Sequence, residues 1–316
     1  MRKFFRARKF LPTPGAFRAQ TRAFGEARVL VRCYYAGLFY FAVALLPEWR
    51  SLLERSTIAP LWPVGWLSYT DLRTGIMLIL ALYLVGALVG LVLPEKGWAR
   101  ALAFLGLFQF VAFNNSFGKI GHSLHVWVLT AFLLIFLPEA AKLASRAGRQ
   151  RFLTIFWGCQ AMLLLVYSMS GLGKVAGAIY QFSTGQPHAF MPGALAAIVA
   201  DRLVETNSRS LLGPWLIDHP FVGWPILICD IYLQLFAFWV AFRPALQKPW
   251  AIGLIVFHIA SFLFLTISFA QNALLLALLL ILSPFRPSQP TWRHTLAALP
   301  LFGGLLARLF GRPCAS

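Results

Sequence analysis

Acidic residues are scarce in this chain of 316 residues. It has 10 Asp and Glu against 28 Lys and Arg, so its formal net charge is +18 at pH 7. Charged residues make up 12% of the chain, about half of the roughly 25% that is usual in a soluble domain. Because 59% of the residues are hydrophobic, one water-facing core cannot bury them all. Composition therefore excludes an ordinary soluble domain and indicates a membrane protein.

Cysteine is also rare, and its placement argues against a metal site. The four cysteines are Cys33, Cys159, Cys229 and Cys314, and none has the spacing of a metal-ligand set. Three of them lie inside apolar runs, where cysteine behaves as a small hydrophobic side chain. Nucleic-acid motifs are lacking as well, so the positive charge does not indicate a nucleic-acid partner. We expect neither a metal nor a nucleic acid.

Apolar runs of about 17–22 residues recur along the chain, the length that crosses a bilayer core of roughly 30 Å. The sequence predicts an all-α fold, a polytopic membrane helix bundle of about eight transmembrane helices. The predicted spans are 29–47, 75–94, 100–117, 122–138, 152–173, 224–242, 250–268 and 270–285.

Lys and Arg gather in every second loop of this arrangement, whereas the loops between them are balanced in charge. Basic loops stay in the cytoplasm, so we predict a multi-pass protein of the plasma (inner) membrane with both termini cytoplasmic. A secretory signal peptide is the rival interpretation, because Ala42-Val43-Ala44 mimics a cleavage site. The charged N-terminal region is too long and the apolar run too extended for that interpretation.

Three regions follow from this topology. Residues 1–28 form a basic cytoplasmic arm that we expect to lie on the anionic leaflet. Residues 29–285 form the transmembrane helical domain. Residues 286–316 form a basic cytoplasmic tail, in which 292–310 fit an amphipathic helix. The outer segment 175–223 is expected to hold a surface helix near 193–205. Gly86 and Gly90 form a GxxxG pair, which favours close helix packing.

Ionisable residues inside a predicted span need a reason, since each costs about 2.5–3.5 kcal/mol or more in a bilayer. Asp230 and His258 have short side chains and cannot reach the interface, so we expect both to face the bundle interior. Two interpretations of them stay open: a structural pair with a neighbouring helix, or a proton relay or substrate contact.

The outer ends of several spans carry further polar residues. Lys174 ends the fifth span, and 3–4 spacing places Tyr167, Ser170 and Gly171 on its helix face. A lysine here either snorkels to the headgroups or faces a ligand. His122 opens the fourth span. The remaining residues at outer ends are Asn115, Gln271 and Asn272. Together these residues predict a polar cavity that opens outward and is shared by Lys174 and His122.

Three ordered stretches resemble the membrane domain of the vitamin K-dependent gamma-glutamyl carboxylase and its bacterial relatives, the HTTM proteins. His122-Ser123-Leu124 is similar to the family's "NHSYL" segment. Ser170-Gly171-Leu172-Gly173-Lys174 is similar to its "AGVKK" segment. Phe257-His258, Gln271-Asn272 and Ser283-Pro284-Phe285 together resemble its "FH…SPLF" helix pair. The resemblance covers roughly residues 30–285.

The resemblance implies a chemistry for two of these residues. In the carboxylase, the lysine that matches Lys174 deprotonates vitamin K hydroquinone. Oxygen then converts the quinol to an epoxide through a strongly basic alkoxide, which removes a glutamate proton before CO₂ adds. The histidine that matches His122 assists carboxylation. The resemblance thus implies Lys174 as a base, His122 as its electrostatic or proton-transfer partner, and a quinol such as reduced vitamin K as substrate.

The chain departs from the family in ways that narrow this expectation. The large extracytoplasmic domain that grips the protein substrate does not follow residue 285, and Gly173 stands where the family has its first lysine. Peptide carboxylation is therefore not expected. The leading hypothesis is an outward-facing pocket for a quinol or lipid-like molecule, with oxidase or epoxidase activity. A non-catalytic membrane scaffold or small-molecule channel is the alternative. The expected partners are membrane lipids or a quinol, and the sequence does not identify a protein partner.

Overall fold

The computed structural model describes residues 17–55, 57–118, 120–285 and 291–309, and all regular structure in these residues is helical. Most of the predicted N-terminal arm lies outside them, as do Cys314 and parts of the C-terminal tail. The chain divides into two compact units, Met1–Met162 and Leu163–Ser316. The boundary falls within the long helix α6 (Arg146–Ser183). We describe each unit by itself.

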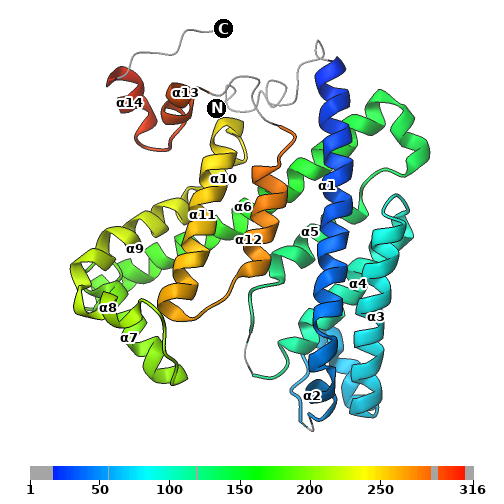
Figure 1. The fold of residues 1–316 in the computed structure, drawn as a ribbon, viewed down its shortest axis with the longest axis horizontal. Helices are drawn as coiled ribbons and strands as arrows, with labels where there is room; N and C mark the ends of the chain where they lie inside the picture. Colours follow the sequence, from blue (N-terminus) through cyan, green and yellow to red (C-terminus); the bar gives the residue numbers. More distant parts are fainter. Residues whose placement is uncertain (1–16, 56, 119, 286–290, 310–316) are drawn as a thin grey trace. The chain divides into compact units, whose positions relative to one another are not determined.

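The first unit contains three long helices in succession, α1 (Phe17–Ala44), α3 (Leu72–Val92) and α4 (Gly97–Asn114), followed by the shorter α5 (His125–Ile135) and the first part of α6. In Figure 1, α3 and α4 run side by side. Shorter segments lie between the helices: η2 (Leu46–Glu48), α2 (Trp49–Leu53), η3 (Trp62–Tyr69) and η4 (Ala140–Ala144).

Glycines bring α3 and α4 into backbone contact. A Cβ atom at Gly86 would lie 2.7 Å from the Leu102 carbonyl oxygen. A Cβ atom at Gly106, on the facing helix, would lie 2.5 Å from the carbonyl oxygen of Leu82. Gly90 completes the predicted pair, because a Cβ there would lie 2.8 Å from a ring carbon of Tyr35. The expectation that the GxxxG pair serves packing is therefore confirmed.

The second unit takes the remainder of α6 and eight further helices of varied length. They are α7 (Ala194–Thr206), α8 (Gly213–Asp218), α9 (Pro220–Leu235), α10 (Ala237–Val240), α11 (Pro244–Leu265), α12 (Ala270–Leu276), α13 (Trp292–Ala297) and α14 (Gly303–Leu309). A π-helical turn, η5 (Ala277–Ile281), continues α12. α7 confirms the predicted helix near 193–205.

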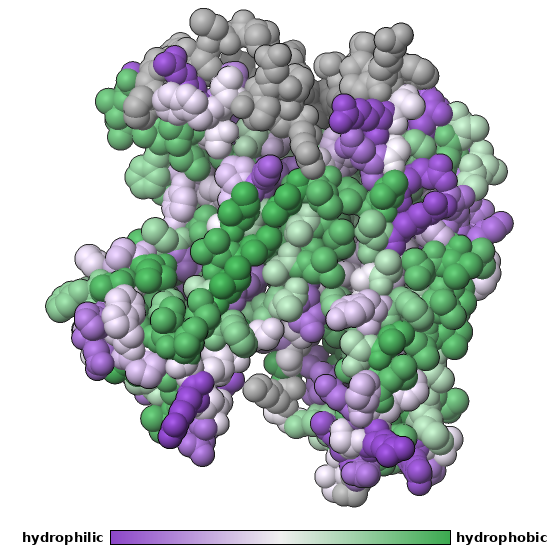
Figure 2. Space-filling view, viewed as in Figure 1, coloured by the Kyte–Doolittle hydropathy of each residue, from purple (hydrophilic) through white to green (hydrophobic). Residues whose placement is uncertain are grey.

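Helix α11 has an apolar exposed face. Its exposed side chains include Ile252, Val256, Ile259 and Phe262, each about half exposed. The opposite face buries Leu254, His258 and Ser261. Hydrophobic side chains also gather along α11 on the face shown in Figure 2. Along this stretch of α11 the polar His258 and Ser261 are turned inward and the exposed face is hydrophobic, the reverse of a helix on a water-soluble protein.

Four helical stretches are long and apolar enough to cross a membrane: Thr21–Leu53, Leu72–Val92, Arg146–Ser183 and Pro244–Leu265. Three shorter apolar helices are His125–Ile135, Pro220–Leu235 and Ala270–Ile281. These seven and α4 together coincide with all eight predicted spans, whose helical character is confirmed.

Several boundaries differ from the prediction. The fourth span, expected over 122–138, is helical only from His125 to Ile135, and 11 residues rise about 16 Å. It starts late because Asn115 Oδ1 accepts a hydrogen bond from the Gly121 amide and holds that segment in a turn. The sixth span is interrupted at Phe236. The tail holds two short helices, α13 and α14, in place of one, because Leu301 between them has a φ of +64°.

Candidate functional site

An ion pair joins α6 to α9 in the second unit. Lys174 Nζ donates to Asp230 Oδ2, and Gln234 Nε2 donates to Asp230 Oδ1 over 2.8 Å. Both carboxylate oxygens are thereby hydrogen-bonded. The Asp230 side chain is 9% exposed and that of Lys174 is 34% exposed. Lys174 Nζ also lies 5.3 Å from the centroid of the Phe257 ring, close enough for a cation–π contact.

Small residues on α6 allow this pair to form. A Cβ atom at Gly171 would lie 2.3 Å from the Leu235 amide nitrogen, so α6 and the end of α9 meet backbone to backbone. Ser168 fixes the same crossing, because its hydroxyl donates to the Leu235 carbonyl and accepts from the Phe238 amide. These bonds satisfy backbone groups at the break between α9 and α10. Lys174 lies one turn beyond Gly171 and therefore reaches Asp230.

A second polar pair lies on the same face of α6. Tyr167 Oη is 2.5 Å from His258 Nε2 on α11. His258 is 5% exposed, its ring contacts those of Phe257 and Phe269, and Asp230 is 8% exposed. The prediction that Asp230 and His258 are turned away from the surface is confirmed. His258 Nδ1 is buried and makes no hydrogen bond to any described residue.

The other predicted site residues of the second unit differ in their exposure. Ser170 is exposed, and Gln271 is half-buried. Asn272 is 7% exposed, and its Oδ1 makes no hydrogen bond to any described residue. The unit thus holds two polar pairs, Lys174–Asp230 and Tyr167–His258, with a buried amide on α12, the helix that follows Phe269.

The predicted residues His122 and Asn115 belong to the first unit. Asn115 Nδ2 lies 3.1 Å from His125 Nε2, and His125 Nδ1 lies 3.3 Å from His122 Nδ1. His122 is exposed, whereas Asn115 is 7% exposed. Because Lys174 belongs to the other unit, the shared cavity of Lys174 and His122 stays a prediction.

Sequence reasoning missed three residues that take part in these networks. Gln234 lies four residues after Asp230 and His125 three after His122, so helical spacing was the signal available for both. Arg100 is the first residue of the third predicted span and was not singled out. It is 1% exposed, and its guanidinium donates to the carbonyl oxygens of Pro94 and Leu137. No sequence pattern marks an arginine whose two terminal nitrogens donate to backbone carbonyls of two separate turns.

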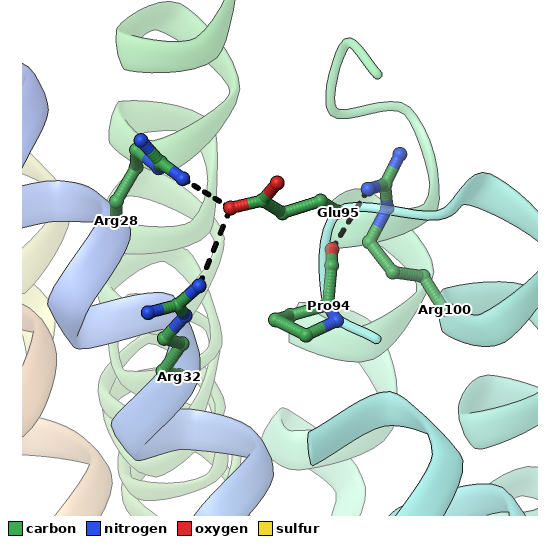
Figure 3. Close-up of polar contacts among 5 residues, drawn as sticks. All are labelled: Arg28, Arg32, Pro94, Glu95 and Arg100. Carbon is green, nitrogen blue, oxygen red and sulfur yellow. Dashed lines mark hydrogen bonds and ion pairs between the residues drawn. The ribbon is translucent and has the colours of Figure 1, made fainter. Parts of the chain in front are cut away.

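Figure 3 shows a basic cluster in the first unit, formed by Arg28, Arg32 and Arg100 around the turn between α3 and α4. Arg28 and Arg32 project from α1 toward Glu95, which lies in the turn between α3 and α4. Arg100, at the start of α4, donates to the Pro94 carbonyl over 2.9 Å. Two arginines share one carboxylate, so the cluster keeps a positive charge.

Among the described residues, no three His, Cys, Asp or Glu side chains gather where they could hold a metal ion. No protein-family model matches the chain, and no curated protein or solved structure matches it. The fold and the polar pairs are thus the ground for a functional argument.

Proposed function

We propose that this chain is an eight-span, HTTM-type protein of the plasma (inner) membrane that binds a quinol or lipid-like molecule at the Lys174–Asp230 pair. Both termini lie in the cytoplasm. The exposed apolar face of α11 supports membrane insertion, because Ile252, Val256 and Ile259 would be costly in water. The basic cluster of Arg28, Arg32 and Arg100 supports the orientation, since it lies at the end of α4 that the positive-inside rule assigns to the cytoplasm.

The observation that carries the proposal is the ion pair between a lysine and a buried carboxylate that lie in apolar stretches of α6 and α9. Ionisable groups in such helices are expensive and usually functional. The sequence alone did not pair Lys174 with Asp230. With Asp230 as partner, Lys174 can pass its ammonium proton to the carboxylate, and the resulting amine can then accept a proton from a ligand hydroxyl. The pair acts in this way as one base, with Gln234 holding the second carboxylate oxygen.

The reaction that fits this base is the oxidation of a quinol by O₂. Lys174 accepts the phenolic proton, and the quinolate is the reductant. Its oxygenation yields one quinone epoxide and one water per quinol and O₂, while the two-electron alternative yields a quinone and hydrogen peroxide. Both reactions balance without a metal. The resemblance to the carboxylase favours the epoxide.

The test uses the purified full chain with a reduced naphthoquinone and O₂, with products separated by liquid chromatography. Wild type is expected to form epoxide or quinone above the rate of the protein-free reaction. Lys174→Ala and Asp230→Asn are expected to lower that rate at least about tenfold, because each removes half of the base. Lys248→Ala, an exposed lysine on α11, is the matched control. Equal rates for wild type and Lys174→Ala would overturn the proposal.

The topology has its own test. Single cysteines at Ser183 and Ser145, which are both exposed, are introduced into a cysteine-free chain and exposed to an impermeant thiol reagent in intact cells. Labelling is expected at position 183 and absent at position 145 until the membrane is opened. Labelling of position 145 from outside would refute the eight-span topology.

A second function is favoured by the same ion pair, which fastens α6 to α9 and leaves the charge of Lys174 satisfied. In that case the bundle is a non-catalytic scaffold or small-molecule channel. The assay above separates the two functions, because a scaffold would lose stability in Lys174→Ala without any quinol turnover in wild type.

A further inference from the structure

The first unit contains an apolar groove of about 360 Å³. Its walls come from α4 and α5 and from the segment that starts η3, and they include Trp62, Phe108, Ala112 and Val128. Asn115 and His125 supply the polar atoms of the lining. The volume is within the range of sites that hold small molecules, about 300–1,000 Å³.

Hydrogen bonds fix the segment that forms the rim of the groove. The Ala59 amide donates to the Ser116 carbonyl, and the Leu61 amide donates to the Ser116 hydroxyl. Both bonds join the segment before η3 to the residues just after α4. The neighbouring Phe117 ring lies 4.0 Å beneath the Arg55 guanidinium. The groove is therefore a built feature, and a cation lies near the end of α4 that carries Asn115.

A directional chain of hydrogen bonds runs from Asn115 to His122. The Gly121 amide donates to Asn115 Oδ1 over 2.8 Å, so the Asn115 amide nitrogen faces His125. That nitrogen can only donate, so His125 Nε2 accepts and the His125 proton is on Nδ1. His125 Nδ1 then donates to His122 Nδ1, which leaves the His122 proton on Nε2.

This series of hydrogen bonds determines which donor atoms remain available to a ligand at the polar end of the groove. His125 lines the groove, but Asn115 and His122 engage both of its ring nitrogens. His122 is exposed, and its Nε2–H is the free donor at the end of the chain. His122 does not line the groove, but its ring is hydrogen-bonded to that of His125, which does, so the donor is presented beside the polar end of the apolar groove.

We propose that this groove binds a single-chain lipid, with its acyl chain against Phe108, Ala112 and Val128 and its head oxygen accepting a hydrogen bond from His122 Nε2–H. The volume suits one chain rather than the pair of chains of a phospholipid. The positive charge of Arg55 near the same end favours an acidic head. The site lies wholly in the first unit and does not rest on the quinol chemistry proposed for Lys174.

The experiment uses palmitic acid that carries a photoreactive diazirine in its chain, with a diazirine hydrocarbon of the same length as the comparison. The full-length protein is labelled in detergent, and the labelled peptides are quantified by mass spectrometry. In wild type the acid is expected to label peptides of α4 and α5 more strongly than those of α3. Ala112→Phe fills the groove and is expected to lower that labelling at least about tenfold. Ala81→Phe, at an exposed alanine of α3, is the matched control and is expected to label as wild type does.

A second pair of variants tests the head-group contact at an exposed position that does not endanger folding. His122→Leu removes the donor and is expected to weaken binding of the acid by about 2- to 10-fold, without changing labelling by the hydrocarbon. His122→Gln restores a side-chain N–H and is expected to retain most of the binding. Undiminished labelling of Ala112→Phe, or equal binding of the acid by wild type and His122→Leu, would overturn the assignment.

Discussion

The two units hold their helices together by different means. In the first unit, α3 and α4 meet through Gly86 and Gly106, each of which lies against a backbone carbonyl of the other helix. In the second unit, side-chain pairs connect α6 to its neighbours: Lys174 to Asp230 on α9, and Tyr167 to His258 on α11. Among the glycines that the structure describes in this unit, Gly171 alone brings α6 into comparable backbone contact.

This difference separates packing from chemistry. Where apolar helices meet through small residues, the contact is made by van der Waals packing and leaves no polar group for a ligand. Where they meet through ionisable pairs, the contact costs desolvation and has a use beyond packing only if the groups react or bind. The ion pairs of the first unit surround the turn between α3 and α4, whereas the second unit places its ion pair between two helices, α6 and α9. We therefore expect the two units to respond differently to the same kinds of substitution.

The largest effect is expected at Gly106. Gly106→Ala places a Cβ 2.5 Å from the Leu82 carbonyl oxygen and 2.9 Å from the Tyr83 Cα, and backbone atoms cannot rotate away. We expect the free energy of unfolding to fall by about 3 kcal/mol or more, measured as thermal stability by size-exclusion chromatography in detergent. Gly158→Ala, at a glycine of α6 with no neighbouring atom within 4 Å, is expected to be neutral or stabilising by up to roughly 1 kcal/mol. Equal losses would break the comparison.

The next effect is expected at Lys174. Lys174→Ala leaves the Asp230 carboxylate without its counter-charge, at an expected cost of about 1–3 kcal/mol. This is less than at a fully buried pair, because the Lys174 side chain is 34% exposed. A double-mutant cycle with Asp230→Asn isolates the coupling between the two groups. Additive losses would mean that the pair contributes nothing of its own, and the contrast with the first unit would then disappear.

A smaller effect is expected at Tyr167. Tyr167→Phe removes the hydroxyl 2.5 Å from His258 Nε2 and leaves that buried nitrogen without its partner. The expected loss of stability is about 1 kcal/mol. Tyr180→Phe is the control, since Tyr180 belongs to the same helix and is 67% exposed. If the two variants melt at the same temperature, the Tyr167–His258 pair does not stabilise the second unit.

The smallest effect is expected at Asp71, the N-cap of α3. Hydrogen bonds from the Thr74 hydroxyl and amide hold the pKa of the Asp71 carboxyl below its ordinary value. The cap therefore stabilises fully above the ordinary carboxyl pKa, and this stabilisation is lost as the pH falls through the lower, folded value. Asp71→Ala is expected to melt slightly below wild type at neutral pH and to converge with it in acid. A constant difference at every pH would refute this origin of the cap.

The sequence was sufficient to predict the helices but not all of their ends. Every span predicted from an apolar run coincides with a helix, because a long apolar run is typical of a buried or membrane-spanning helix. The apolar runs misjudged the start of α5, because the bond from Gly121 to Asn115 lies between residues that no periodicity connects. They also missed the break between α9 and α10, where Ser168 of a distant helix satisfies the Phe238 amide.

The candidate site was predictable in part for the same reason. The rarity of ionisable groups in apolar runs was enough to select Lys174, Asp230 and His258. Their pairing was not predictable, because it depends on how closely α6 approaches α9, and that closeness is set by Gly171 against Leu235. The hydrogen-bond chain through His125 needed coordinates as well, since its direction follows from which atom of Asn115 faces Gly121.

The exposed face of α11 also constrains how a cell makes this protein. A ribosome that released the finished chain into water would present Ile252, Val256, Ile259 and Phe262 to every other nascent chain nearby. Such a face aggregates unless something apolar covers it. For the membrane protein that we propose, insertion into the bilayer while the chain is still being synthesised avoids that exposure. We expect expression in cells with a limiting supply of membrane-insertion machinery to yield aggregates long before it yields a soluble form.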